Sequence, residues 1–162
     1  MFNFTRNFTL FAGMACAVVI VGCGEKDLSA VNPKWDRDVC EHCKMAVSDP
    51  HFSAQVVTKA GEHLFFDDLG CALIWMSRNE KRAQGSVLYA TDALSGKWVE
   101  RKDAIFVTPY VTPMSYGIGV LSKGSSVPEG KQVLTDDQMQ ENILKTFRKK
   151  QESRAGGHVH NH

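Results

Sequence analysis

Residues 53–76 read SAQVVTKAGEHLFFDDLGCALIWM, in which two strand patterns and a helix pattern follow one another without a break. The β-branched and alternating residues 54–59 predict a strand, and residues 63–66 predict a second one. Between them, Ala60-Gly61-Glu62 has the composition of a turn. We therefore expect a β-hairpin that leads directly into a helix.

The helix is predicted from its cap and from its apolar period. Asp67 or Asp68 supplies a side-chain oxygen at the N-cap position. Apolar residues then recur at i, i+3, i+4 and i+7, which is the period of a buried helical stripe. The stripe consists of Leu69, Ala72, Leu73 and Met76. Cys71 lies beside this stripe, where a small buried core residue is expected.

Upstream of the hairpin, Val39-Cys40-Glu41-His42-Cys43-Lys44-Met45 brings three sulfur side chains and an imidazole into six positions. If the backbone is extended through Cys43 and Met45, residues i and i+2 point to the same face. A thiolate and a thioether then converge on one point. These soft donors favour Cu(I) over Mg(II), Ca(II) or Mn(II).

Other interpretations of this segment stay open. Cys40 and Cys43 have the spacing of half a structural zinc site, of a thiol redox motif, or of a short-loop disulfide. The sequence contains no second Cys-x-x-Cys for zinc, and no βαβ context for a redox motif. Met45 as a plain core residue is the remaining alternative.

Residues 1–22 have the features of a secretory signal peptide, with Arg6 ahead of an apolar run that is short for a membrane span. The run ends in Ile20-Val21-Gly22-Cys23, which resembles a bacterial lipobox. We expect Cys23 to carry acyl chains as the first residue of the mature protein. Gly24 after it, by resemblance to Gram-negative lipoproteins, permits transfer to the outer membrane. An ordinary cleavage site or an uncleaved anchor is the alternative.

Residues 23–38 contain Pro33 and mixed charges, and we expect a tether that lets the following domain stand off the membrane. The mature chain has eighteen basic and eighteen acidic side chains, since Arg6 is the one charged residue that is lost with the signal peptide. A neutral chain has no basic field for nucleic acid, so we expect no nucleic-acid partner. Acyl chains are the expected membrane anchor. The metal-binding domain is expected over residues 39–150.

The cysteine count gives a further hint. Once Cys16 leaves with the signal peptide and Cys23 takes the lipid, Cys40, Cys43 and Cys71 remain. Three thiols cannot all pair as disulfides. An unpaired cysteine in an oxidising compartment indicates a metal ligand, a reactive thiol or a buried apolar residue.

The second half of the chain repeats the theme of strands followed by a helix. Strands are predicted at Val87–Thr91, Lys97–Val99 and Ile105–Val107, with a return through Tyr116–Leu121. Between the last two lies Thr108-Pro109-Tyr110-Val111-Thr112-Pro113-Met114-Ser115, a loop that two prolines stiffen. A stiff loop presents one side chain accurately, so Met114 is a ligand candidate.

The C-terminal part is predicted as a loop over 122–132 and a helix over 134–150. Thr135 or Asp136 caps this helix, and its acidic start and basic end agree with the helix dipole. Its apolar face consists of Met139, Ile143, Leu144 and Phe147. Residues 151–162 are expected to form a disordered tail, in which metal binding by His158, His160 and His162 stays open.

Taken in order behind a lipobox, four blocks resemble the NosL family of periplasmic copper-binding lipoproteins. The blocks are Cys40-Glu41-His42-Cys43-Lys44-Met45, Phe66-Asp67-Asp68-Leu69-Gly70-Cys71, Gly96-Lys97-Trp98 and Thr112-Pro113-Met114-Ser115-Tyr116-Gly117. The resemblance spans about residues 39–121. Family members often have Gly where Lys44 stands here, which puts a tight backbone turn at this position in doubt.

The resemblance implies a fold and a function. The fold is α+β, with two small ββα-type, treble-clef-like units packed together and a C-terminal helix. The function is a non-enzymatic Cu(I) chaperone that is lipid-anchored in the periplasm. It delivers copper to apo nitrous-oxide reductase for assembly of its copper-sulfide cluster. By position, the resemblance assigns Cu(I) to Cys43, Met45 and Met114, with Cys40 and His42 as secondary candidates. Whether the protein dimerises around the metal stays open.

The same fold kinship suggests an enzymatic alternative. An organomercurial lyase needs thiolates and a carboxylic acid that protonates the carbon leaving group. Cys40, Cys43 and Cys71 with Asp67 or Asp68 are the residues for those roles. A zinc-binding or thiol-redox module is the third class considered.

Overall fold

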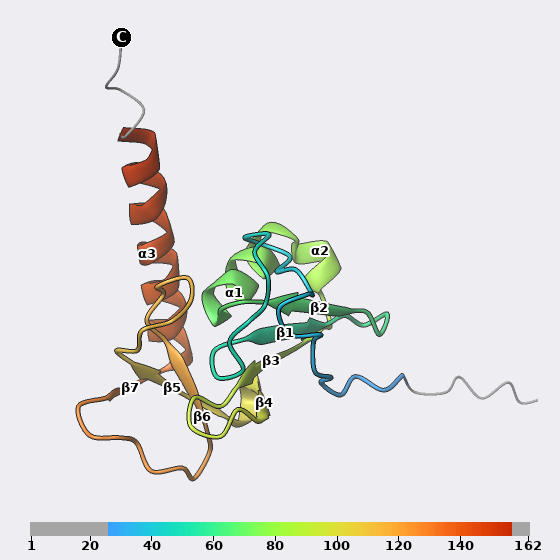
Figure 1. The fold of residues 1–162 in the computed structure, drawn as a ribbon, viewed down its shortest axis with the longest axis horizontal. Helices are drawn as coiled ribbons and strands as arrows, with labels where there is room; N and C mark the ends of the chain where they lie inside the picture. Colours follow the sequence, from blue (N-terminus) through green and yellow to red (C-terminus); the bar gives the residue numbers. More distant parts are fainter. Residues whose placement is uncertain (1–25, 157–162) are drawn as a thin grey trace, which may run out of the picture.

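The structure is a computed structural model, and it describes residues 26–156 (Figure 1). The predicted signal peptide, the lipid site Cys23 and the three histidines of the tail lie outside the described residues. Within residues 26–156, no helix combines the length and the apolar character that a membrane crossing requires.

The predicted hairpin and helix are confirmed. Strand β1 (Ala54–Val57) pairs antiparallel with β2 (His63–Phe66), and helix α1 (Leu69–Arg78) follows. Asp68 is the N-cap of α1, and its side chain accepts a hydrogen bond from the Gly70 N–H at 2.8 Å. The local pattern of the sequence therefore sets this unit.

The strands that follow α1 join the same sheet. After the short helix α2 (Glu80–Ala83), β3 (Val87–Thr91) pairs antiparallel with β1, and β4 (Trp98–Glu100) pairs with β3. The sheet order is β2-β1-β3-β4. Strands β3 and β4, from the second half of the chain, thus belong to the same sheet as β1 and β2. They join it because the buried Leu88 and Ala90 of β3 complete the core beside β1.

A second sheet holds the remaining strands. The 3₁₀ turn η1 (Arg101–Asp103) leads into β5 (Ala104–Thr108), which lies between β6 (Gly119–Ser122) and β7 (Gln132–Leu134). Residues 132–134 were expected at the end of a loop and the start of a helix. They pair with β5 as an edge strand, in which Gln132 and Val133 are exposed and Leu134 is half-buried, so three residues give no apolar alternation from which a strand is recognised.

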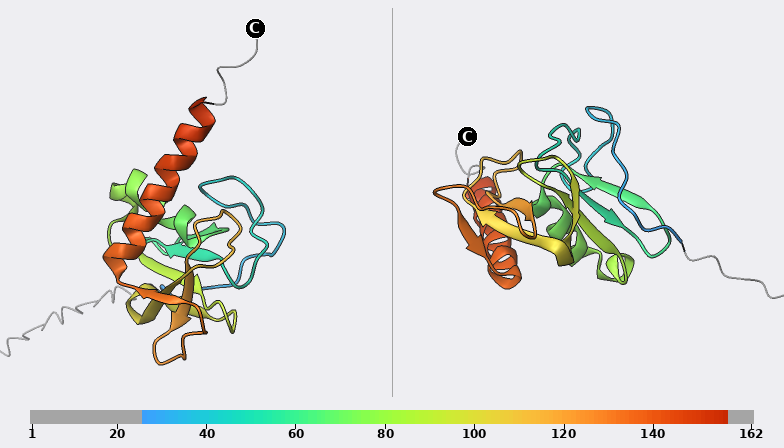
Figure 2. Two further views of the ribbon diagram at one scale, coloured as in Figure 1. Left: turned by 90° about the vertical axis from the view of Figure 1, so that its left-hand side faces the viewer. Right: turned by 90° about the horizontal axis from the view of Figure 1, so that it is seen from below.

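Helix α3 (Asp136–Gly156) closes the chain that the structure describes. Thr135 caps it through a reciprocal pair: the Gln138 N–H donates to Thr135 Oγ1 and the Thr135 N–H donates to Gln138 Oε1. The helix runs to Gly156, so the expected disordered tail is wrong for residues 151–156. This exposed end has no apolar period, but it is built from residues that tolerate a helix, and it projects beyond the sheets (Figures 1 and 2).

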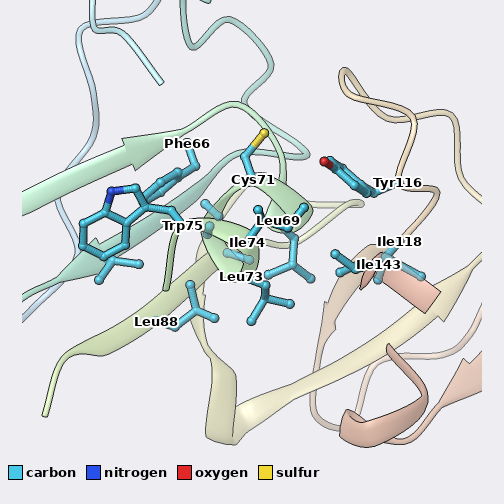
Figure 3. Close-up of a cluster of buried hydrophobic side chains, with 14 of the residues drawn as sticks. Phe66, Leu69, Cys71, Leu73, Ile74, Trp75, Leu88, Tyr116, Ile118 and Ile143 are labelled. Atoms are coloured by element: carbon cyan, nitrogen blue, oxygen red, sulfur yellow. The ribbon is translucent and has the colours of Figure 1, made fainter. Parts of the chain in front are cut away.

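The fold class, α+β with a C-terminal helix, is confirmed. One hydrophobic core joins the two sheets and the two longer helices. Phe66 and Trp75 pack with ring centroids 5.8 Å apart, while Ile118 and Ile143 approach from the other side (Figure 3). The core therefore fixes the second sheet and α3 against α1.

Part of the expected tether is docked on the domain. Gln55 is fully buried in β1, and its amide donates to the Val31 carbonyl at 2.7 Å and accepts from the Val31 N–H at 3.0 Å. Trp98 Nε1 donates to Asn32 Oδ1 at 2.8 Å. A free tether over all of residues 23–38 is therefore wrong, because the buried Gln55 amide needs these backbone partners.

Candidate metal centre

The segment from Val39 to Ala46 is a tight turn closed by a bridge between its ends. The Cys40 N–H donates to the Met45 carbonyl at 2.8 Å, and the Lys44 N–H donates to the Cys40 carbonyl at 3.0 Å. Lys44 has a φ of +63°. The backbone is therefore not extended through Cys43 and Met45, the condition on which their convergence was predicted, and a tight turn forms although a lysine stands at the left-handed position.

This turn brings Cys40 and Cys43 to the N-terminal end of α1, which carries Cys71. The sulfur atoms of Cys40, Cys43 and Cys71 all lie within 4.8 Å of one another, and none of the three forms a disulfide. Cys40 and Cys71 are 0% exposed, whereas Cys43 is half-buried. We call these three residues the cysteine cluster.

Cys71 belongs to the core and to the cluster together. It is buried in the first turn of α1, as the sequence predicts, but its sulfur is directed away from Leu73 and Leu88 (Figure 3). For the copper site, sequence reasoning assigned Cys71 to the core, and it grouped Cys71 with Cys40 and Cys43 only in the lyase alternative. The odd number of cysteines was the available signal, since it left a thiol without a partner.

The cluster is electrostatically unequal. A hydrogen bond from the Cys71 thiol, followed by backbone N–H groups of Cys43, Asp67 and His42, outweighs burial and lowers the pKa of Cys40 to about 5. The same hydrogen bond, together with burial, raises the pKa of Cys71. Burial raises the pKa of Cys43 to about 11. These interactions thus favour the thiolate form of Cys40 and the thiol forms of Cys43 and Cys71.

A second sulfur group meets the cluster at Cys43. Cys43, Met45 and Met114 line one pocket of about 330 Å³, which we call the sulfur pocket. Met45 is 54% exposed and Met114 is half-buried. The remaining lining residues are His42, Arg78, Tyr116, Phe147, Lys150, Gln151 and Arg154. The three residues assigned by resemblance therefore line a common pocket, although they come from two distant loops.

His42 occupies the α3 side of this pocket. Its ring lies edge-on to Phe147, with centroids 5.9 Å apart. Burial, ahead of the charges of Arg78 and Lys44, lowers the pKa of His42. The imidazole is therefore neutral at pH 7, which is the form that binds a metal.

The backbone of Met114 is held from both sides. Its N–H donates to the buried Asp68 carboxylate at 3.1 Å, and its carbonyl accepts from Lys150 Nζ. Asp68 also accepts from Thr112 Oγ1 at 2.6 Å, while capping α1. One carboxylate thus ties the Met114 loop to the helix that carries Cys71.

Gly70 lets this loop approach α1. A Cβ at Gly70 would lie 2.3 Å from the Tyr116 ring, closer than any packing allows. The ring is buried, and Lys150 Nζ lies 4.4 Å from its centroid. Glycine is therefore required at position 70 so that the loop with Tyr116 and Met114 can pack against α1.

The donor set does not complete a structural zinc site. Within residues 26–156, the possible metal-binding group of His, Cys, Asp and Glu side chains contains the three cysteines. Structural zinc takes four such ligands. A larger pocket of about 650 Å³ lies between β3, η1 and β5, but neither a cysteine nor a histidine lines it. The sulfur-rich arrangement is suited to Cu(I).

Comparison with known proteins agrees with these observations. The NosL family model matches residues 33–124, which is more than half of the chain. The matched range contains the cysteine cluster, Met45 and Met114, and it ends before α3. No curated protein matches the chain.

Proposed function

Because the chain belongs to the NosL family, we propose that it is a Cu(I) chaperone and that copper binds at Cys43, Met45 and Met114. Its acceptor is apo nitrous-oxide reductase, which receives the copper for its copper-sulfide cluster. The chaperone works in the periplasm, anchored by acyl chains on Cys23 to the outer membrane.

One observation supports the metal assignment most strongly. Cys43, Met45 and Met114 line the same pocket, and they provide one thiolate and two thioethers. Such soft, low-coordinate sets suit Cu(I) and are too poor in thiolate for a closed zinc site. The exposure of Met45 suits a carrier, since a cargo ion must be reached by the acceptor.

The proposal is tested by transfer of copper. The full-length chain in detergent, loaded with one equivalent of Cu(I) under reducing conditions, is mixed with apo nitrous-oxide reductase and then separated from it. We expect copper in the reductase fraction, strongly reduced transfer from Met114→Ala, and weakened retention of copper by Cys43→Ser. Met76→Ala is the matched control, because Met76 lies on α1 outside the sulfur pocket. Equal transfer from Met114→Ala and from the unaltered chain would reject the assignment.

A lyase-like thiol enzyme is the second candidate, and one feature favours it. Asp67 is buried beside Cys40, and burial raises the pKa of its carboxyl group, as a proton donor requires. The test is incubation of the reduced chain with phenylmercuric acetate and measurement of benzene. We expect no benzene above the level given by free thiol, and its catalytic release would favour the enzyme.

A further inference from the structure

Cys43 belongs to both sulfur groups of the protein. Towards the interior, its sulfur lies within 4.8 Å of those of Cys40 and Cys71. Towards the surface, Cys43 lines the sulfur pocket with Met45 and Met114. Each group contains three sulfur side chains, and Cys43 is common to both.

The inner group has separations suited to a metal. With metal–sulfur bonds of about 2.3 Å, three sulfurs around one ion lie about 4 Å apart and two sulfurs in a line lie about 4.6 Å apart. The observed limit of 4.8 Å covers both arrangements with small movements. Cys40 and Cys71 are 0% exposed, so an ion there is shielded from solvent and from competing ligands.

The outer group differs in chemistry and in access. It exchanges two cysteines for two thioethers, which are neutral and bind Cu(I) less strongly than thiolates do. Met45 is 54% exposed, so an ion held there is open to an incoming ligand. The inner group thus favours retention of the metal, and the outer group favours exchange.

We propose that the protein holds Cu(I) at two positions that share Cys43: an inner thiolate position with Cys40 and Cys71, and an outer position with Met45 and Met114. This inference rests on the proposed function and assigns its two phases, storage and hand-off, to different ligands. The step between them is ligand exchange without a change of oxidation state. The copper bonds to Cys40 and Cys71 break as those to Met45 and Met114 form, Cys43 stays bound, and the freed thiolates take up protons from water as needed.

Two double variants separate the positions. Cys40→Ser/Cys71→Ala removes the inner position, and Met45→Ala/Met114→Ala removes the outer one. Cu(I) affinity and the rate of Cu(I) extraction are both measured with a competing chelator on the reduced full-length chain in detergent. We expect the Cys40→Ser/Cys71→Ala variant to bind Cu(I) about tenfold or more weakly. The Met45→Ala/Met114→Ala variant should release Cu(I) to the chelator about tenfold more slowly, with little change in affinity.

The combination of the two pairs gives the sharper test. In the cysteine-pair background only the outer position remains, so loss of Met45 and Met114 should now cost affinity as well. Met76→Ala is the control for both backgrounds, since it removes a thioether outside both groups. Unchanged affinity and extraction rate in Cys40→Ser/Cys71→Ala would overturn the inference and leave the proposed function standing. Copper binding that persists undiminished in Cys43→Ser would overturn both.

A measurement on the unaltered sequence tests the inner position without any substitution, so it does not depend on whether the variants fold. The chain is prepared with selenomethionine, loaded with one equivalent of Cu(I), and measured at the selenium absorption edge. We expect no copper neighbour around selenium, because the ion rests at the inner position. A copper–selenium contact at this stoichiometry would overturn the inner resting position, whatever the variants show.

Discussion

The position of Tyr116 depends on a single missing side chain, that of Gly70. A Cβ there would meet the ring carbons at 2.3 Å, and the ring is already buried. Gly70→Ala should therefore destabilise the fold by about 1–3 kcal/mol, as overpacking does. It should also displace the loop that carries Met114.

Urea denaturation measures the stability, and Gly156→Ala provides the control. Gly156 lies near the end of α3 and a Cβ there meets nothing within 4 Å. Its replacement should change the free energy of unfolding by less than about 0.5 kcal/mol. Equal effects at the two glycines would contradict the account of Gly70.

The three thiols respond differently to pH. Because the pKa of Cys43 is about 11 and that of Cys40 about 5, copper displaces a proton from Cys43 at neutral pH but none from Cys40. Between pH 6 and 8, each displaced proton raises Cu(I) affinity about tenfold per pH unit. Cys43→Ser should therefore lower the slope of log affinity against pH by about one, and Cys40→Ser should leave that slope unchanged. Chelator competition at pH 6, 7 and 8 measures it, and equal slopes in the two variants would contradict these protonation states.

At the scale of elements, Asp92 ties the end of β3 to β6. Its carboxylate accepts from the Leu94 and Ser95 N–H groups at 3.0 and 2.9 Å, and from the Ser122 N–H and hydroxyl at 2.7 and 2.9 Å. Burial opposes ionisation, but these hydrogen bonds prevail and lower the pKa of Asp92 to about 2.

From the low pKa of Asp92 we predict that the protein loses stability in acid. A lowered pKa in the folded state contributes stability above the unfolded value near 3.8, and this stability is lost as the pH falls towards 2. The contribution is on the order of 2 kcal/mol. Asp92→Asn should lose it at pH 7 and should differ less from the unaltered chain at pH 2.5. Thermal unfolding at both pH values tests this, and a constant difference would contradict it.

Helix α3 takes part in the site through Lys150. Its ammonium donates to the Met114 carbonyl and lies over the Tyr116 ring. Lys150→Leu should cost about 1 kcal/mol of stability, the worth of one such hydrogen bond, and slow extraction of Cu(I). Lys149→Leu, at the exposed neighbour, should do neither. In a Met114→Ala background the effect of Lys150→Leu on extraction should vanish, and full additivity would contradict a role through Met114.

The elements show what a sequence can and cannot reveal. The hairpin and α1 were predictable because their signals, a turn and an apolar stripe, are local. Strand β7 and residues 151–156 of α3 were not predictable, since the strand is three residues long and the exposed end of the helix has no apolar period. The turn at Lys44 was obscured because a lysine occupies a left-handed position that usually favours glycine.

At the scale of the whole molecule, the site lies where separate parts of the chain meet. The turn at residues 39–46, the start of α1, the Met114 loop and α3 all contribute side chains. Met114 was a candidate from its proline-stiffened loop and by resemblance, and the structure brings it to the same pocket as Cys43. For Cys71 the odd cysteine count was a signal, whereas the contribution of Lys150 to the loop was not predictable, because it depends on how distant elements pack. The family match ends before α3, yet this helix covers one wall of the pocket.

The central claim is that this chain is a soft-metal carrier whose binding depends on Cys43. The most direct test is Cu(I) affinity of the reduced full-length chain in detergent, measured by chelator competition with excess Zn(II) present. We predict that the unaltered chain and Met76→Ala keep Cu(I), and that Cys43→Ser loses about a hundredfold in affinity, or about 2.7 kcal/mol. Displacement of Cu(I) by Zn(II), or undiminished Cu(I) affinity in folded Cys43→Ser, would contradict the claim.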